Sequence, residues 1–232
     1  MLSSLLLVNL LACAPKVLTL PGPVDSMEVQ PVAQWSVRPP SSTAGDRVAA
    51  SAARFVGAKR LVVDGKKHRW DCSGLVEAAY AASGLVVKGS SANLWGQARS
   101  RGVLHRRRTA GRVGDVVFFD DTWDRDGDRR LDDDLTHVGV VERVEGKGAY
   151  TLVHLVNGGV QRLRMDLRAR HVHADPEPPH LLRNDFLRAR KSDDRRRTRY
   201  LAGELWRGFG RLWSVAPSTT RVDGPVASAA AP

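Results

Sequence analysis

Three residues of this sequence, Cys72, His137 and His154, carry the side chains that nucleophilic amide chemistry requires. A cysteine nucleophile needs a base that takes its proton and returns it to the leaving group. It also needs a third polar group that orients the base. A thiol with two histidines downstream can fill these roles if the fold brings the three side chains together.

Cys72 is expected on the first turn of a short core helix. After it, apolar residues recur at intervals of three and four until Gly84, which is typical of a helix that ends at a glycine. Unpaired N–H groups and the positive end of the helix dipole favour a thiolate at this position, so we expect a lowered thiol pKa. A small buried cysteine that serves only packing is the alternative.

The two histidines lie in consecutive strand-like runs, joined by a turn at residues 145–148. If the hairpin loop has an even number of residues, His154 falls opposite an odd-numbered residue at or near His137, and both imidazoles point from one sheet face. An odd-numbered loop would place them on opposite faces. The five other histidines do not lie in a clean strand pattern downstream of the thiol. They are His68, His105, His171, His173 and His180.

The elements that must position these residues follow a simple order. Helices are expected at about 46–57, with Asp46 as N-cap, at 72–84 and at 91–100. A strand and turn are expected at 61–65, and short β-branched or aromatic runs follow at 116–119, 138–144, 150–156 and 160–165. Helices followed by an antiparallel meander indicate an α+β domain.

Four sequence blocks, in this order, resemble the NlpC-type family of bacterial cell-wall cysteine peptidases over roughly residues 46–168. They are Asp71-Cys72-Ser73-Gly74-Leu75-Val76, Gly114-Asp115-Val116-Val117-Phe118-Phe119, His137-Val138-Gly139-Val140-Val141 and Val153-His154. The resemblance implies a compact papain-like α+β fold, with the cysteine at a helix N-terminus packed on the antiparallel meander.

The same resemblance implies roles and a reaction. Cys72 would be the nucleophile, His137 the general base and acid, and His154 the residue that orients His137. The implied reaction is hydrolysis of an amide bond in the peptidoglycan stem peptide, typically between D-glutamate and a diamino acid, through an acyl-enzyme and with no cofactor required for the chemistry. The alternatives are a related thiol amidase or acyltransferase, and a non-catalytic lipoprotein that binds cell wall. An intact thiol and histidine set argues against the binder.

Two features depart from the family pattern. The segment Gly57-Ala58-Lys59-Arg60 lacks the tyrosine that often shapes the substrate site, and the loop before His137 is longer and more acidic than usual. In that loop, Asp124, Asp126, Asp128 and Asp132 occupy positions one, three, five and nine of a pattern that resembles a calcium-binding EF-hand loop.

The calcium pattern is incomplete, because Arg129 stands at the glycine position and Leu135 at the position of the bidentate glutamate. We expect a structural calcium ion in this loop. The alternative is a solvated loop that is neutralised by its own arginines.

The N-terminal segment resembles a lipoprotein signal. An apolar run over residues 5–12 ends in Leu10-Leu11-Ala12-Cys13, like the site at which lipoprotein precursors are cleaved and lipidated on the cysteine. No Lys or Arg precedes the run, so an ordinary apolar N-terminus or a start upstream are alternatives. We expect residues 1–13 to be the signal segment, Cys13 to carry a lipid anchor, and 14–45 to form a Pro- and Ser-rich tether.

Composition and charge set the remaining expectations. The 232 residues suffice for one well-buried domain plus tails, and we place that domain at 46–180. The net charge of +11 favours polyanions such as an acidic cell wall. The absence of zinc-finger spacing, aromatic-studded basic strands and recognition-helix patterns argues against nucleic acid.

Beyond this domain we expect an Arg-rich extension at 181–215 with an amphipathic helix over 200–213, and a disordered tail at 216–232. The protein is expected in the bacterial cell envelope, facing the periplasm or the exterior, with peptidoglycan and the membrane as its partners. The sequence leaves the oligomeric state open, and a monomer is the working expectation.

Overall fold

The computed structural model describes residues 43–130, 132–192 and 194–218. The chain divides into a unit Met1–Arg38 and a unit Pro39–Pro232, and every described residue belongs to the second. The expected signal segment with Cys13, the tether up to residue 42, and residues 219–232 of the tail therefore lie outside the described residues.

Three helices precede the main sheet: α1 (Ala44–Arg54), α2 (Cys72–Ala81) and α3 (Ser91–Ser100). The N-cap of α1 is Thr43 and not the expected Asp46, because the Thr43 hydroxyl accepts the Asp46 N–H while the Asp46 carboxylate accepts the Thr43 N–H. Within the described part of the chain, each helix is too short or too polar to cross a membrane.

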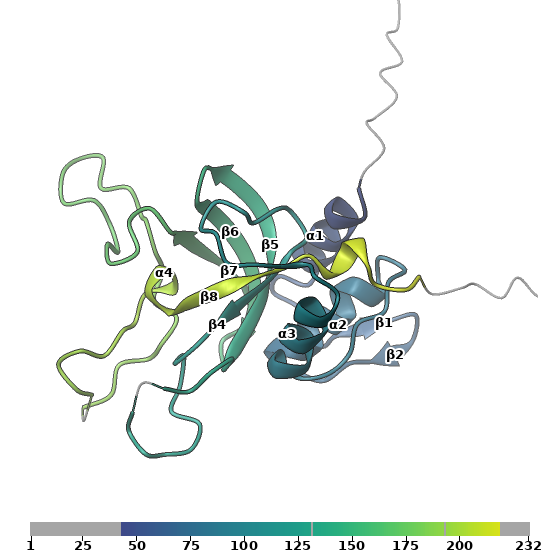
Figure 1. Ribbon diagram of the computed structural model, residues 1–232, viewed down its shortest axis with the longest axis horizontal. Coiled ribbons are helices and arrows are strands. Elements are labelled where there is room, and N and C mark those ends of the chain that lie inside the picture. The colour runs from purple at the N-terminus through teal and green to yellow at the C-terminus, as the bar shows by residue number, and fades with distance from the viewer. Residues whose placement is uncertain (1–42, 131, 193, 219–232) are drawn as a thin grey trace, which may run out of the picture. The chain divides into compact units, whose positions relative to one another are not determined.

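Six strands build one antiparallel sheet in the order β3-β8-β4-β5-β6-β7 (Figure 1). A separate small hairpin, β1 (Val62–Val63) with β2 (Lys66–Lys67), precedes α2. The strands of the main sheet are β3 (Leu104–His105), β4 (Val116–Phe119), β5 (His137–Gly146), β6 (Ala149–Val156), β7 (Gly159–Asp166) and β8 (Trp206–Gly210). The α+β prediction is confirmed.

Both faces of the sheet are covered, which explains why β4 is apolar at every position. Val116 and Phe118 pack in a cluster with residues of α1, α2 and α3. Val117 and Phe119 belong to a second cluster on the opposite face, together with Leu205 of α4 (Ala202–Leu205). The sheet therefore lies between the three N-terminal helices and the C-terminal segment.

The prediction of an amphipathic helix over 200–213 is wrong. After the single turn of α4 the chain forms β8, which lies between β3 and β4 and pairs with both. The glycines of this run require a close approach that a helix would not supply: a Cβ at Gly208 would lie 3.1 Å from the Trp95 ring, and one at Gly210 would lie 3.0 Å from the Ala98 Cβ.

The expected domain end at residue 180 is wrong for the same reason. A boundary there would remove β8 from its place between β3 and β4, and the compact unit continues past residue 180. The Arg-rich segment is therefore part of the domain and not an appendage.

Candidate active site

Cys72 is the first residue of α2, where the sequence places it. Asp71 is the N-cap, and its Oδ1 accepts the Gly74 N–H at 2.6 Å. A Cβ at position 74 would lie 2.0 Å from the carbonyl oxygen of Arg69, so a glycine is required for this tight entry into the helix. The Asp-Cys-Ser-Gly block thus sets the start of α2 and the position of the thiol.

The thiol pKa differs from the prediction. Burial raises the pKa of Cys72 above its usual value of 9.0, and the neighbouring Asp71 carboxylate adds to the rise. Hydrogen bonds from the Val138 backbone N–H and the Ser73 hydroxyl act in the opposite direction but do not cancel it. The expectation of a lowered pKa neglected desolvation of the thiolate, which is the largest cause of the rise.

His137 and His154 come together in the sheet. His137 Nε2 lies 3.1 Å from His154 Nδ1, and the two rings meet edge to face. In the ladder His154 pairs with Gly139, so His137 is its diagonal neighbour on the same face.

The shared face depends on two irregularities in the β5–β6 ladder. The register shifts once between Val141 and Arg143 and again between Val144 and Gly146. A single shift would turn the His154 side chain to the other face of the sheet. Two shifts cancel, so His154 lies on the face that the tight turn after Gly146 would give it without any shift.

Gly139 makes room for the histidine pair. A Cβ at this position would lie 2.9 Å from the carbonyl oxygen of Val153 and 3.3 Å from the Cβ of His154. A side chain here would push β6 away from β5 and carry the second imidazole with it. The glycine between the two histidine strands is therefore needed for their 3.1 Å contact.

Both imidazoles are held neutral by their surroundings. Burial, with a further effect of His154, lowers the pKa of His137 to about 3, and burial lowers the pKa of His154 to about 4. His154 Nε2 is buried without a hydrogen-bond partner. At neutral pH the site therefore holds a neutral thiol and two neutral imidazoles.

A cavity of about 780 Å³ joins the thiol to the first histidine, since Cys72 and His137 both line it. It lies at the end of the sheet where β4 and β6 finish and β5 begins, next to the start of α2. In the described chain no hydrogen bond links the thiol to His137; the side-chain partner of Cys72 is the Ser73 hydroxyl at 4.0 Å. Catalytic contacts in ligand-free structures are often looser than in the reacting complex.

Sequence reasoning missed most of the lining of this cavity, including two tryptophans and two residues of the Arg-rich segment. Trp70 and Trp123 flank it with side chains that are 44% and 52% exposed, an unusual position for tryptophan. Leu187 and Ala189, from the Arg-rich segment, line another part of the wall. Trp70 directly precedes the Asp71 motif and was a usable signal, whereas nothing in the sequence marks Leu187 or Ala189.

The chain just before His137 is firmly held. The backbone N–H and the hydroxyl of Thr122 both donate to the Thr136 hydroxyl oxygen at 2.9 Å, and the Trp123 Nε1–H donates to the Thr136 carbonyl at 3.3 Å. These bonds tie the end of β4 to the start of β5. They fix the backbone from which His137 projects.

The acidic loop brings together three of the four expected calcium ligands. Asp124, Asp126 and Asp128 offer carboxylate oxygens that all lie within 4.8 Å of one another, and Asp132 is not among them. The loop also supports itself without a cation, because Asp124 accepts the N–H groups of Gly127 and Arg129 at 2.8 and 3.1 Å.

Comparison with known proteins agrees with the resemblance seen in the motifs. Residues 63–155 match the CHAP domain, a range that includes Cys72, His137 and His154. The comparison with curated proteins gave no match.

Among solved structures, the chain is similar to a lipoprotein-like protein of the NLP/P60 family from Staphylococcus aureus. The identity is 19% and the TM-score 0.33, over 51% of this chain and 35% of that one. This chain thus spans about a third of that protein, and a similarity at this level supports no further inference.

Proposed function

We propose that the protein is a cysteine peptidase of peptidoglycan, a proposal supported by the match of residues 63–155 to the CHAP domain. Its substrate would be an amide bond of the stem peptide, most simply the one between D-glutamate and the diamino acid. Cys72 would act as nucleophile, His137 as general base and acid, and His154 as the residue that orients His137.

One observation carries this proposal: the 3.1 Å contact between His137 Nε2 and His154 Nδ1 beside a cavity that Cys72 also lines. The contact occupies one nitrogen of His137 and leaves Nδ1 for the thiol. A base that is oriented by a third group next to a nucleophile is the arrangement that acyl transfer requires.

The pKa directions define the resting state and hence the first step. Since the thiol and the imidazole are both neutral, the Cys72 proton passes to His137 Nδ1 as Sγ attacks the carbonyl carbon. The developing imidazolium is stabilised by His154. Collapse of the tetrahedral intermediate breaks the C–N bond, and His137 returns the proton to the leaving amine.

In deacylation, water takes the place of the thiol as nucleophile and Cys72 becomes the leaving group. Water attacks the thioester carbonyl while His137 takes its proton, the C–S bond breaks, and the thiol is restored as the stem-peptide carboxylic acid leaves. The negative oxygen of each tetrahedral intermediate would be stabilised in part by N–H groups at the start of α2, where the helix dipole is also favourable.

Two accompanying features belong to the same proposal. Lipidation of Cys13 would hold the domain at the membrane in the cell envelope, close to peptidoglycan. A calcium ion bound by Asp124, Asp126 and Asp128 would cross-link the loop that follows Trp123. The charge of +11 supports residence near anionic wall polymers.

The test is mass spectrometry of purified peptidoglycan incubated with wild type or with Cys72→Ala. New stem-peptide fragments with wild type alone would support the thiol hydrolase, and their masses identify the bond. A new amide in place of a free carboxyl would favour the acyltransferase. If neither protein releases fragments and both sediment with the wall, the non-catalytic binder replaces this proposal.

A further inference from the structure

Two exposed tryptophans line the active-site cavity. Trp70 and Trp123 are 44% and 52% exposed, and both belong to the cavity wall. Large aromatic side chains are seldom left open to water, and two of them at one cavity indicate a surface that a ligand covers. The proposed reaction does not use them, because the roles of nucleophile, base and orienting residue are filled by other side chains.

Both tryptophans lie close to the reacting side chains. Trp70 is two residues before Cys72, the first residue of α2. The Trp123 Nε1–H donates to the carbonyl oxygen of Thr136, the residue before His137. A group that packs on these rings therefore belongs to a part of the substrate close to the scissile bond.

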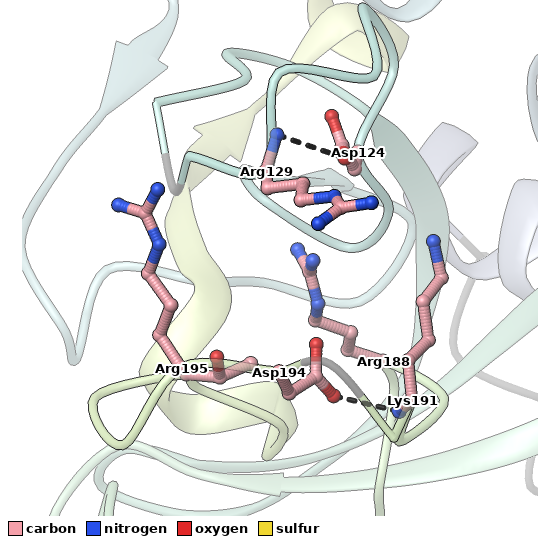
Figure 2. A pocket seen from close by; sticks show the side chains of 7 residues that line it. Asp124, Arg129, Arg188, Lys191, Asp194 and Arg195 are labelled. Carbon is pink, nitrogen blue, oxygen red and sulfur yellow. Dashed lines mark hydrogen bonds between the residues drawn. The ribbon is translucent and has the colours of Figure 1, made fainter.

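The segment that carries Trp123 is held by its own hydrogen bonds. Asp124, the next residue, accepts the N–H groups of Gly127 and Arg129 at 2.8 and 3.1 Å, and Figure 2 shows the bond from Arg129. The bond from the Trp123 indole to Thr136 fixes the ring itself. A side chain that is already positioned loses little conformational entropy when a ligand binds.

Hydroxyl groups supply much of the remaining polar lining. They belong to Ser73, Ser90, Ser91, Thr122 and Thr136. The hydroxyls of Ser90, Ser91 and Thr122 donate to acceptors of the protein itself, so a ligand meets them as acceptors. Such oxygens suit a ligand that carries several O–H donors.

The cavity offers little net charge to a ligand. Among the described residues of its lining, the charged side chains are Arg69 and Asp71, which pair with each other at 3.2 Å. The far end of a stem peptide carries carboxylates and an amino group, whereas the sugar at its near end has uncharged hydroxyl and acetamido groups. The uncharged end of the substrate is therefore the better match to this lining.

We propose that Trp70 and Trp123 bind a sugar ring of the glycan strand, so that the substrate is a stem peptide still attached to its glycan. The C–H groups on one face of a pyranose ring form an apolar surface that packs on a flat indole, while its hydroxyls project from the edge. A cavity of about 780 Å³ has room for such a ring together with a short peptide. The inference rests on the proposed function and narrows its substrate.

The test compares two soluble substrates, the same stem peptide with and without its disaccharide. The test variant is Trp70→Ala, because Trp123 also supports Thr136 through its indole N–H. The control is Leu181→Ala, which alters an apolar side chain that is 49% exposed and is not among the described residues of the cavity lining.

Wild type and control should hydrolyse the glycan-linked peptide with a kcat/KM about tenfold higher or more than that of the free peptide, and in Trp70→Ala this ratio should fall close to one. Each ratio compares two substrates of one variant, so a smaller folded fraction cancels. Equal kcat/KM values for the two substrates in wild type, or a ratio that is unchanged in Trp70→Ala, would overturn the sugar site.

A binding measurement separates this inference from the proposed reaction. Cys72→Ala is titrated calorimetrically with the same two compounds, and the glycan-linked peptide should bind about tenfold more tightly, a difference that is lost when Trp70→Ala is added. This result would support the sugar site even if wild type cleaves neither compound. Equal affinities, or no binding of either compound, would overturn the site even if wild type cleaves both.

Discussion

His137 Nε2 lies 3.1 Å from His154 Nδ1, and this contact leaves Nδ1 as the other ring nitrogen of His137. If His137 carries its proton on Nε2 and donates it to His154, then Nδ1 has the lone pair that a base needs. The proton of His154 then resides on Nε2, which is buried without a partner. The opposite tautomer would place a proton on His137 Nδ1 and block proton transfer from Cys72.

The first prediction concerns His154. His154→Ala removes the acceptor that selects the working tautomer, and we expect a loss of about 100-fold in kcat with little change in KM. His154→Asn places an amide oxygen close to the position of Nδ1 and should recover most of the rate. Equal losses in the two variants would show that His154 acts through packing alone.

The second prediction concerns the thiol. Because burial raises the Cys72 pKa and His137 is neutral, the alkylation rate with iodoacetamide should rise about tenfold per pH unit from pH 6 to pH 9. The measurement uses a Cys13→Ser background, which leaves Cys72 as the remaining cysteine. A rate plateau below pH 7 that disappears in His137→Ala would instead reveal a preformed thiolate–imidazolium pair.

The third prediction concerns the space between the histidine strands. Gly139→Ala places a Cβ 2.9 Å from the Val153 carbonyl oxygen, so we expect a loss of about 1–3 kcal/mol of unfolding free energy. Activity should also fall, because the shift of β6 carries His154 away from His137. Gly96→Ala is the matched control, because its Cβ meets no atom within 4 Å on an exposed helix position. It should leave stability unchanged or raise it by up to about 1 kcal/mol. Urea unfolding of both variants makes the comparison.

The fourth prediction concerns calcium. If the ion binds the carboxylates of Asp124, Asp126 and Asp128, calcium at about 100 times its Kd should stabilise the native state by about 2.7 kcal/mol. The melting temperature should rise with calcium and fall with chelator, and Asp126→Asn with Asp128→Asn should abolish both changes. An unchanged melting temperature in wild type would mean that the loop supports itself through its own N–H donors.

Much of the fold follows from local pattern. The strand over 116–119 and the helix over 91–100 occur with the predicted bounds, because Gly114-Asp115 precedes the short apolar run of the strand and Gly102 follows the helix. The β8 strand was missed because its apolar residues happen to recur at intervals of three and four. Its place between β3 and β4 follows from the close approach of Gly208 and Gly210 to α3, which is a tertiary contact.

The candidate site was predictable in part. The start of α2 follows from the Asp71 cap, but the shared face of the histidines depends on two register shifts that no local signal marks. The raised thiol pKa results from burial in the assembled fold, where the thiol meets the backbone of Val138, a residue distant in sequence. Such desolvation depends on the assembled cavity and not on the motif around the cysteine.

The most direct test of the central claim is the intact mass of the protein after brief incubation with soluble stem-peptide fragments of peptidoglycan and an acid quench. The mechanism predicts an added mass equal to the acyl part of the substrate, located on the Cys72 peptide and absent from Cys72→Ala. Fragment release by Cys72→Ala at the wild-type rate, or an adduct on another residue, would contradict the assignment of Cys72 as nucleophile.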